Sequence, residues 1–223
     1  MFTIFDAETI SVIALTLRMT LSSTVISCVI GIPLGLWLDR AQFRGKGAVV
    51  VINRTLMATP PVVMGLVVFL LLMRAGPLGF LGWLFTLEAM IIAQTLLITP
   101  IICGIVYTAS QRNSSRIRAF AITMGANKLQ TNLLLLKELG NEIFFAAVTG
   151  FGRAMSEVGA IMIVGGNIRN RTRVMTTAIS LLNNRGEREQ AIILGVILMA
   201  IALSIQLIAD RIRKGEQRVD ENI

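Results

Sequence analysis

The sequence predicts an all-α membrane protein with about five transmembrane helices. Of its 223 residues, 54% are hydrophobic and only 15% are charged, and the mean hydropathy is +0.73. A soluble domain of this length cannot bury so much apolar surface, so lipid is the expected solvent. The apolar residues also fall into separate runs close to the ~20 residues that cross a bilayer, and charged loops connect these runs.

Five apolar runs predict the membrane-spanning helices, and residues 1–223 are expected to form a single transmembrane domain. The predicted spans are residues 10–38, 55–73, 84–107, 143–164 and 191–209. An odd number of crossings places the two termini on opposite sides of the membrane.

Several of these spans contain proline. Pro33 lies in the first span, Pro60 and Pro61 lie in the second, and Pro100 follows Thr99 in the third. Proline frees backbone groups that a neighbouring helix or a water-lined cavity has to satisfy. A packing kink explains one such residue, whereas several in so small a protein favour a translocation path. The residues expected to line it here are Pro60, Pro61, Thr99 and Pro100.

The basic residues predict the orientation. More than half of the 21 Lys and Arg residues lie in the segments 39–48 and 111–142 and in the tail after residue 209. These three segments fall on one face of the membrane. By the positive-inside rule this face is cytoplasmic, so we expect a multi-pass protein of the cell (inner) membrane with its N-terminus outside and its C-terminus in the cytoplasm.

The segment 165–190 does not fit this pattern, because it carries five arginines on the face assigned to the outside. Either the number of spans is off by one, or the loop folds against the protein and its charges serve a partner or an anionic substrate. The second interpretation is favoured because no further apolar run supplies another crossing.

Several functional classes are disfavoured. The chain has no His, and its two Cys residues, Cys28 and Cys103, lie in apolar runs, so neither a metal site nor a disulfide is expected. The net charge of +8 is spread over several loops rather than gathered in one stripe, which argues against nucleic acid. We expect no catalytic residues and no cofactor on this chain, because it has neither a phosphate-loop motif nor a paired acid constellation.

The segment 112–142 is far longer than a turn requires. Ser114 or Ser115 is expected to cap a helix that Gly125 ends, and a second short helix follows from about Leu129 to Lys137. Two amphipathic helices that meet at a glycine lie either on the lipid surface or against a soluble partner. The apolar residues at helical spacing in the first helix are Ile117, Phe120, Ala121 and Met124.

Residues 117–126 resemble the cytoplasmic coupling motif of ABC importer permeases. The chain reads IRAFAITMGA here, with Ala119, Phe120 and Ala121 in the positions of the usual Glu-Ala-Ala and Gly125 in that of the glycine. Ala119 stands where the family usually has an acid, and the proline common further along is absent, but the helix–glycine–helix pattern is kept. The resemblance implies coupling to an ATPase through Arg118, Ala119, Phe120, Ala121, Met124, Gly125, Ala126, Lys128 and Leu129.

Further segments resemble the permeases for tungstate, molybdate and sulfate. Residues 59–66 are similar to the second-span signature of this oxyanion group. The segments most similar to the tungstate branch are 76–79, 93–100, 150–160, 164–168 and 172–179. The resemblance therefore covers the chain from about residue 55 to 180.

This resemblance implies a type I ABC importer permease fold with a cytoplasmic coupling helix and a homodimer around the translocation path. A cytoplasmic ABC ATPase dimer would dock on the helices from Arg116 to Lys137 within the coupling segment 112–142, with ATP and Mg bound on the ATPase. An extracytoplasmic binding protein would deliver a tetrahedral oxyanion, with tungstate favoured. Molybdate or sulfate import is the alternative within this class. An ATP-independent anion channel and a membrane-embedded enzyme are the alternatives from other classes.

Two charged residues lie within the predicted fourth span. Arg153 and Glu157 are four residues apart and would share one helical face. An intramembrane charge costs about 3 kcal/mol on insertion scales and normally faces a cavity or a partner. Either Arg153 lines the anion path while Glu157 positions it, or the two form an internal ion pair that fixes helix packing.

Overall fold

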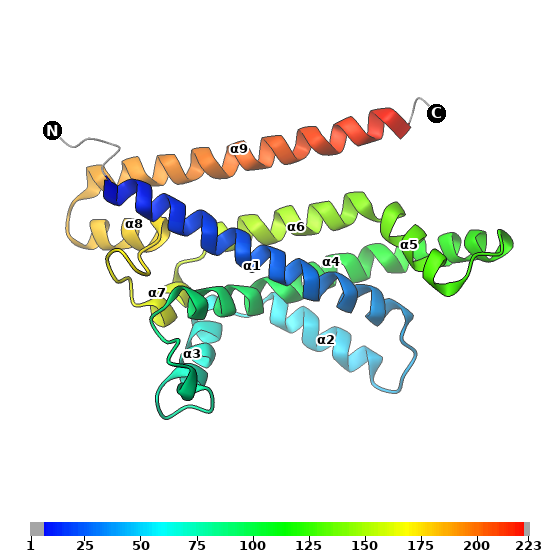
Figure 1. The fold of residues 1–223 in the computed structure, drawn as a ribbon, viewed down its shortest axis with the longest axis horizontal. Helices are drawn as coiled ribbons and strands as arrows, with labels where there is room; N and C mark the ends of the chain where they lie inside the picture. The colour runs from blue at the N-terminus through cyan, green and yellow to red at the C-terminus, as the bar shows by residue number, and fades with distance from the viewer. Residues whose placement is uncertain (1–6, 221–223) are drawn as a thin grey trace. The chain divides into compact units, whose positions relative to one another are not determined.

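Helices joined by turns and loops make up the part of the protein that the structure describes (Figure 1). The computed structural model describes residues 7–220, with side chains over 8–127 and 129–211. In chain order the elements are α1 (Ala7–Arg40), α2 (Lys46–Met57), α3 (Pro61–Leu72), the 3-10 helix η1 (Gly79–Leu81), α4 (Leu87–Thr123), α5 (Lys128–Glu138), α6 (Gly140–Met155), α7 (Gly159–Gly165), α8 (Met175–Asn184) and α9 (Arg188–Asp220). No strand occurs within residues 7–220, so the predicted all-α fold class is confirmed.

Within the described residues, three helices are long and apolar enough to cross a membrane. They are Glu8–Arg40 of α1, Leu87–Thr123, which is all of α4, and Arg188–Arg211 of α9. Two bent helix pairs, α2 with α3 and α6 with α7, raise the number to five if each pair forms one span. This range agrees with the predicted membrane fold of about five helices.

The predicted second span, residues 55–73, is not one straight helix. Helix α2 starts at Lys46, inside the segment predicted as a loop, and the chain bends by 101° between α2 and α3. Pro60 is extended, with φ −60° and ψ 130°, and Pro61 is the first residue of α3. The bend occurs here because Pro61 has no N–H and disfavours the helical conformation at Pro60.

The chain divides into two compact units. The first contains the chain up to Ser23, Pro60–Gln94 and the chain from Phe151 onward. The second contains Thr24–Thr59 and Thr95–Gly150.

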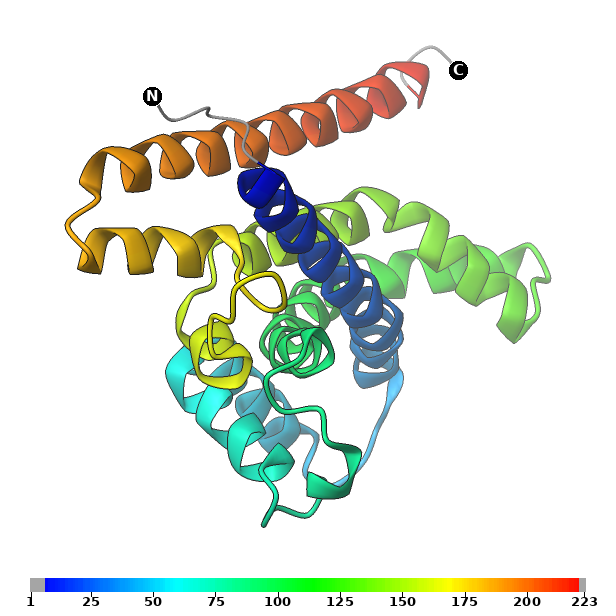
Figure 2. The ribbon, with the colours of Figure 1, turned by 60° about the vertical axis from the view of Figure 1, so that its left-hand side comes forward.

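In the first unit, α8 and α9 form an antiparallel hairpin beside the start of α1 (Figure 2). Its core is the buried cluster of Val12, Met175, Ala178 and Leu194. Elsewhere in the unit, α3 packs against α7 at Gly65. A Cβ atom on Gly65 would lie 2.6 Å from the Cα of Ala160, so this helix contact requires the absence of a side chain.

In the second unit, α1 packs closely on α4 through two glycines one helical turn apart. A Cβ on Gly31 would lie 3.1 Å from Ile102, and a Cβ on Gly35 would lie 2.8 Å from the carbonyl oxygen of Cys103. Small residues at this spacing let two membrane helices approach backbone to backbone. Ala109, Leu135 and Leu139 form a separate buried cluster that holds α4 to α5.

Candidate functional site

The segment predicted to couple to an ATPase forms a hairpin, which we call the α4–α5 hairpin (residues 112–138). The prediction that Ser114 or Ser115 caps a new helix is wrong, because α4 runs without a break from Leu87 to Thr123 and buries Ser114. Neither proline nor glycine occurs between Gly104 and Gly125, so the transmembrane helix continues through Ser114 and Ser115. The hairpin is therefore covalently continuous with a membrane-spanning helix.

The turn of the α4–α5 hairpin lies at Gly125, where the helix was expected to end. Gly125 has φ +73°, a left-handed conformation that glycine adopts without steric cost. Helix α5 then begins with a capping box that the sequence analysis missed. The Asn127 side chain accepts a hydrogen bond from the Gln130 N–H, and the Gln130 side chain accepts one from the Asn127 N–H, each at 2.9 Å.

Apolar side chains cover the outside of the α4–α5 hairpin. Their exposed fractions are 60% for Phe120, 70% for Ile122, 72% for Met124, 78% for Leu129 and 69% for Leu133. Such a concentration of exposed apolar side chains marks an interaction surface.

The remaining residues of the predicted coupling set lie in different environments. Ala119 is exposed, Ala121 is buried and Ala126 is half-buried. The Lys128 side chain lies outside the described part of the structure, although its backbone begins α5. Arg118 points into the second unit and belongs to the polar cluster described next.

The polar cluster centres on Asp39, which is in the last turn of α1 and whose side chain is 8% exposed. Arg118 Nη2 lies 2.8 Å from the Asp39 carboxylate, and the Ser110 hydroxyl donates to the same oxygen at 2.9 Å. Lys46 Nζ, at the start of α2, donates to the Asp39 carbonyl oxygen at 2.9 Å. The cluster therefore ties α1, α2 and α4 together within the second unit.

The predicted intramembrane charge pair lies at the end of α6, with Arg153 in its last turn and Glu157 in the break before α7. Arg153 and Glu157 do not share one continuous helix, because α6 ends at Met155, α7 begins at Gly159, and the chain bends by 61° between them. Glu157 is 6% exposed, and its Oε2 lies 4.0 Å from Nη2 of Arg153, whose side chain is 42% exposed. The other carboxylate oxygen of Glu157 accepts a hydrogen bond from the N–H of Ala160 at 3.2 Å, so this acid also satisfies the start of α7.

The carbonyls left open by this break are satisfied within the first unit. Gln94 donates from Nε2 to the carbonyl oxygen of Ala154 at 2.8 Å, and its Oε1 accepts from the Ser23 hydroxyl at 2.7 Å. Thr176 donates to the carbonyl oxygen of Glu157 at 2.8 Å. Irregular backbone at membrane depth is tolerated when buried side chains take up its polar groups in this way.

The other predicted path residues fall in both units. Pro60 and Pro61 start α3, which packs against α7 beside the Glu157 break. Thr99 and Pro100 lie in the part of α4 that belongs to the second unit. The Pro100 carbonyl oxygen accepts a hydrogen bond from Asn53 Nδ2 at 3.2 Å, whereas the buried Thr99 hydroxyl has no partner among the described residues.

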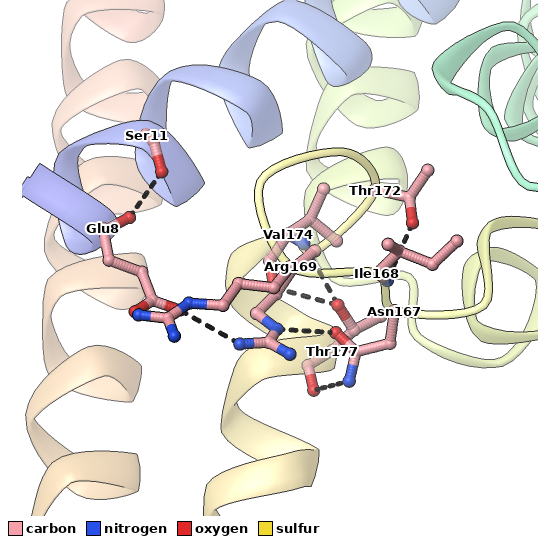
Figure 3. Close-up of polar contacts among 9 residues, drawn as sticks. Glu8, Ser11, Asn167, Ile168, Arg169, Thr172, Val174 and Thr177 are labelled. Carbon is pink, nitrogen blue, oxygen red and sulfur yellow. Dashed lines mark hydrogen bonds and ion pairs between the residues drawn. The ribbon is translucent and has the colours of Figure 1, made fainter.

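The arginine-rich loop after α7 folds against the start of α1 (Figure 3). Glu8 pairs through its carboxylate with both Arg169 and Arg173, and Arg173 Nη1 lies 3.0 Å from Oε1 of Glu8. Asn167 in turn accepts from Arg173 and donates to the carbonyl oxygen of Thr177. This folding agrees with the favoured interpretation of residues 165–190, while a role of their charges toward a partner stays a prediction.

Comparison with known proteins connects these features to a family. Residues 31–217 match the family of binding-protein-dependent transport system inner membrane components. This range includes the α4–α5 hairpin and the break at Glu157.

Several relatives extend over most of the chain. A tungstate uptake system permease protein of Peptoclostridium acidaminophilum is 43% identical over 204 residues, which cover 92% of this chain and 90% of that protein. A tungstate uptake system permease protein of Campylobacter jejuni is 33% identical over 216 residues, covering 96% and 90%. A molybdenum transport system permease protein of Azotobacter vinelandii is 29% identical over 181 residues, covering 76% and 79%.

These matches confirm the resemblance seen in the sequence motifs. The extent of the family match and the coverage of the relatives exclude a resemblance limited to one helix or one loop. The chain belongs to the family of binding-protein-dependent transport system inner membrane components.

Proposed function

We propose that this chain is the membrane subunit of an ATP-driven importer that carries a tetrahedral oxyanion, with tungstate as its substrate. Coupling to an ATPase is supported by the α4–α5 hairpin, which continues a membrane-spanning helix and exposes apolar side chains. The substrate follows from the two relatives named for tungstate uptake, which align over almost the whole chain.

The length of α4 supports a protein partner for the hairpin rather than a resting place on lipid. Its 37 residues give a helix of about 56 Å, whereas the hydrocarbon core of a bilayer is about 30 Å thick. The end of α4 therefore projects into water if the helix crosses the membrane. Leu129 and Leu133, one turn apart on α5, would remain exposed there unless a protein covers them.

In this proposal the hairpin docks on a cytoplasmic ABC ATPase dimer, which binds the ATP and Mg that the transport cycle uses. The hairpin face of the membrane is then the cytoplasmic one, the N-terminus lies outside and the C-terminus lies inside. The excess of Lys and Arg on that face supports this orientation. An extracytoplasmic binding protein hands over the oxyanion on the opposite face.

We further propose that two copies of the chain enclose the translocation path. Val62, Leu66 and Leu70 on α3 are 55%, 49% and 47% exposed at four-residue intervals, and this apolar stripe fits lipid as well as the second copy proposed here. The path is proposed to pass the helix breaks at Pro60 and Glu157, where Arg153 keeps part of its guanidinium accessible. A partly paired arginine attracts a dianion without holding it too tightly for release.

The test is ATP-dependent uptake in vesicles that contain this chain, its ATPase and its binding protein. We expect saturable uptake of labelled tungstate that unlabelled tungstate inhibits at lower concentration than molybdate or sulfate. If molybdate inhibits best, the chain is a molybdate permease, the second candidate that the Azotobacter relative supports. Uptake that persists without ATPase or ATP contradicts the proposal and indicates a channel.

The docking role of the hairpin gives a separate prediction. Replacing both Leu129 and Leu133 by aspartate should lower ATP-driven uptake about tenfold or more, because each buried anchor of a protein interface contributes at least about 1 kcal/mol. The measurement is uptake together with co-purification of the ATPase, since loss of docking has to reduce both.

Phe80 provides the matched control for this double variant. It is 81% exposed and lies on η1, which belongs to the first unit and is not part of the hairpin. The Phe80→Ser variant should retain uptake and the bound ATPase. Normal uptake by the Leu129→Asp/Leu133→Asp protein would show that the hairpin is not the docking surface.

A further inference from the structure

The first unit contains a cavity of about 360 Å³ between the start of α1, helix α8 and the start of α9. Polar side chains surround its mouth: Glu8, Arg169, Arg173, Arg185, Glu187 and Gln190. Its volume lies within the range of small-molecule sites, which is roughly 300–1,000 Å³. Neither the oxyanion path nor the ATPase docking surface uses it.

The lining of the cavity changes from polar to apolar along both long helices. On α1 it passes from Glu8 to Val12, which is about 6 Å along the helix axis. On α9 it passes from Gln190 to Ile197, about 10 Å along the axis. Both helices are candidate membrane spans and both begin at this cavity. The cavity therefore has the same polarity profile as the boundary between lipid headgroups and hydrocarbon.

The mouth of the cavity carries a net positive charge, because its three arginines outnumber its two glutamates. Glu8 already pairs with Arg169 and Arg173. Arg185 follows the last residue of α8, is exposed, and has no ion-pair partner among the described residues. One arginine is thus left to meet an anionic group at the mouth.

We propose that this cavity binds an anionic phospholipid. The phosphate contacts Arg185 at the mouth, and the first methylenes of an acyl chain lie along Leu182, Leu194 and Ile197. A single negative charge, as on phosphatidylglycerol, balances the net charge of the mouth. A guanidinium forms short, charge-assisted hydrogen bonds with a phosphate, so Arg185 is the group at the mouth that recognises the headgroup.

The apolar wall distinguishes a lipid from a free oxyanion. An inorganic oxyanion would use only the arginines and leave the wall exposed to water. The outer face of α9 is also open, since Ile192, Val196 and Met199 are 66%, 61% and 73% exposed. A lipid of the surrounding bilayer can therefore reach the cavity beside α9.

The experiment measures lipids bound to the purified full-length chain by native mass spectrometry. The chain is delipidated in detergent and given equal amounts of phosphatidylglycerol and phosphatidylcholine with identical acyl chains. We expect preferential retention of about one phosphatidylglycerol per chain. The Arg185→Gln variant should lower this retention about fivefold, the effect of one arginine near an anionic headgroup.

Two further variants separate the cavity from general surface charge. Arg171→Gln removes an exposed arginine of the loop between α7 and α8 that does not line the cavity, and it should leave phosphatidylglycerol retention unchanged. Ile193→Trp narrows the apolar part without changing the charge, and it should lower retention of phosphatidylglycerol. Melting temperatures of all three proteins establish that they are folded.

Three results would overturn the proposal. They are equal retention of the two lipids, an equal loss from Arg171→Gln and Arg185→Gln, and cross-linking of the cavity mouth to a second copy of the chain in native membranes.

Discussion

Replacing Arg118 by methionine should destabilise the protein more than any other single loss of charge in the α4–α5 hairpin. The Asp39 side chain is 8% exposed beside Arg118, and the variant leaves its carboxylate with the Ser110 hydroxyl as its donor among the described side chains. Removing one partner of a buried pair costs about 3 to 5 kcal/mol, because the other charge stays buried without compensation. Arg118 itself is 29% exposed, so we expect a value near the lower limit, about 3 kcal/mol.

The measurement is thermal unfolding of the purified protein in detergent, with Arg112→Met as the matched control. Arg112 is an exposed residue of the same helix, and its loss should leave the melting temperature nearly unchanged. The double variant Asp39→Asn/Arg118→Met should be more stable than the sum of its two single variants predicts. Equal melting temperatures for the Arg118→Met and Arg112→Met proteins would show that the Asp39 pair does not hold α1 to α4.

Replacing Gly65 by alanine should also destabilise the protein strongly. A Cβ at this position would lie 2.6 Å from the Cα of Ala160, which is backbone that no side-chain rotation can move away. Helices α3 and α7 therefore have to separate, and overpacking of this kind costs about 1 to 3 kcal/mol, occasionally more. Since α7 follows the break at Glu157, we also expect uptake to fall.

Gly47 supplies a control, because replacing it by alanine is expected to stabilise the protein rather than destabilise it. It lies in α2 and has no atom within 4 Å of a Cβ position. Gly47→Ala should raise stability by up to about 1 kcal/mol, because alanine restricts the unfolded chain and favours helix. Melting temperatures of the two variants are compared under identical detergent conditions. A Gly65→Ala protein as stable as the Gly47→Ala protein would rule out the close crossing of α3 and α7.

Features set by local sequence were predictable. Apolar runs gave the existence of the membrane helices, Gly125 gave the turn of the hairpin, and Pro60 with Pro61 gave the position of one bend. Each depends on the chemistry of a few neighbouring residues. The size of the bend was not predictable, because it depends on what α2 and α3 pack against.

Contacts between residues far apart in the chain could not be predicted from the sequence. Asp39 lies at the end of an apolar run in the sequence. Its partners Ser110 and Arg118 follow more than 70 residues later, and no local pattern predicts that they contact it. Gln94 was a comparable signal, a polar side chain inside an apolar run, whose contact with the Ala154 carbonyl exists only in the folded chain. The four-residue spacing of Arg153 and Glu157 suggested one helical face, but the helix ends between them.

The two helix bends determine what reporter groups fused to both ends of the chain will show. The described residues cross the membrane five times if each bent pair is a span and three times if neither is. Both numbers are odd, so equivalent bends leave the two reporters on opposite sides. Reporters on the same side require one bend to cross while the other turns back. A dual-reporter experiment therefore does not count the crossings. It tests whether the bends at Pro60 and Glu157 behave alike, that is, whether both pairs cross the membrane or both turn back.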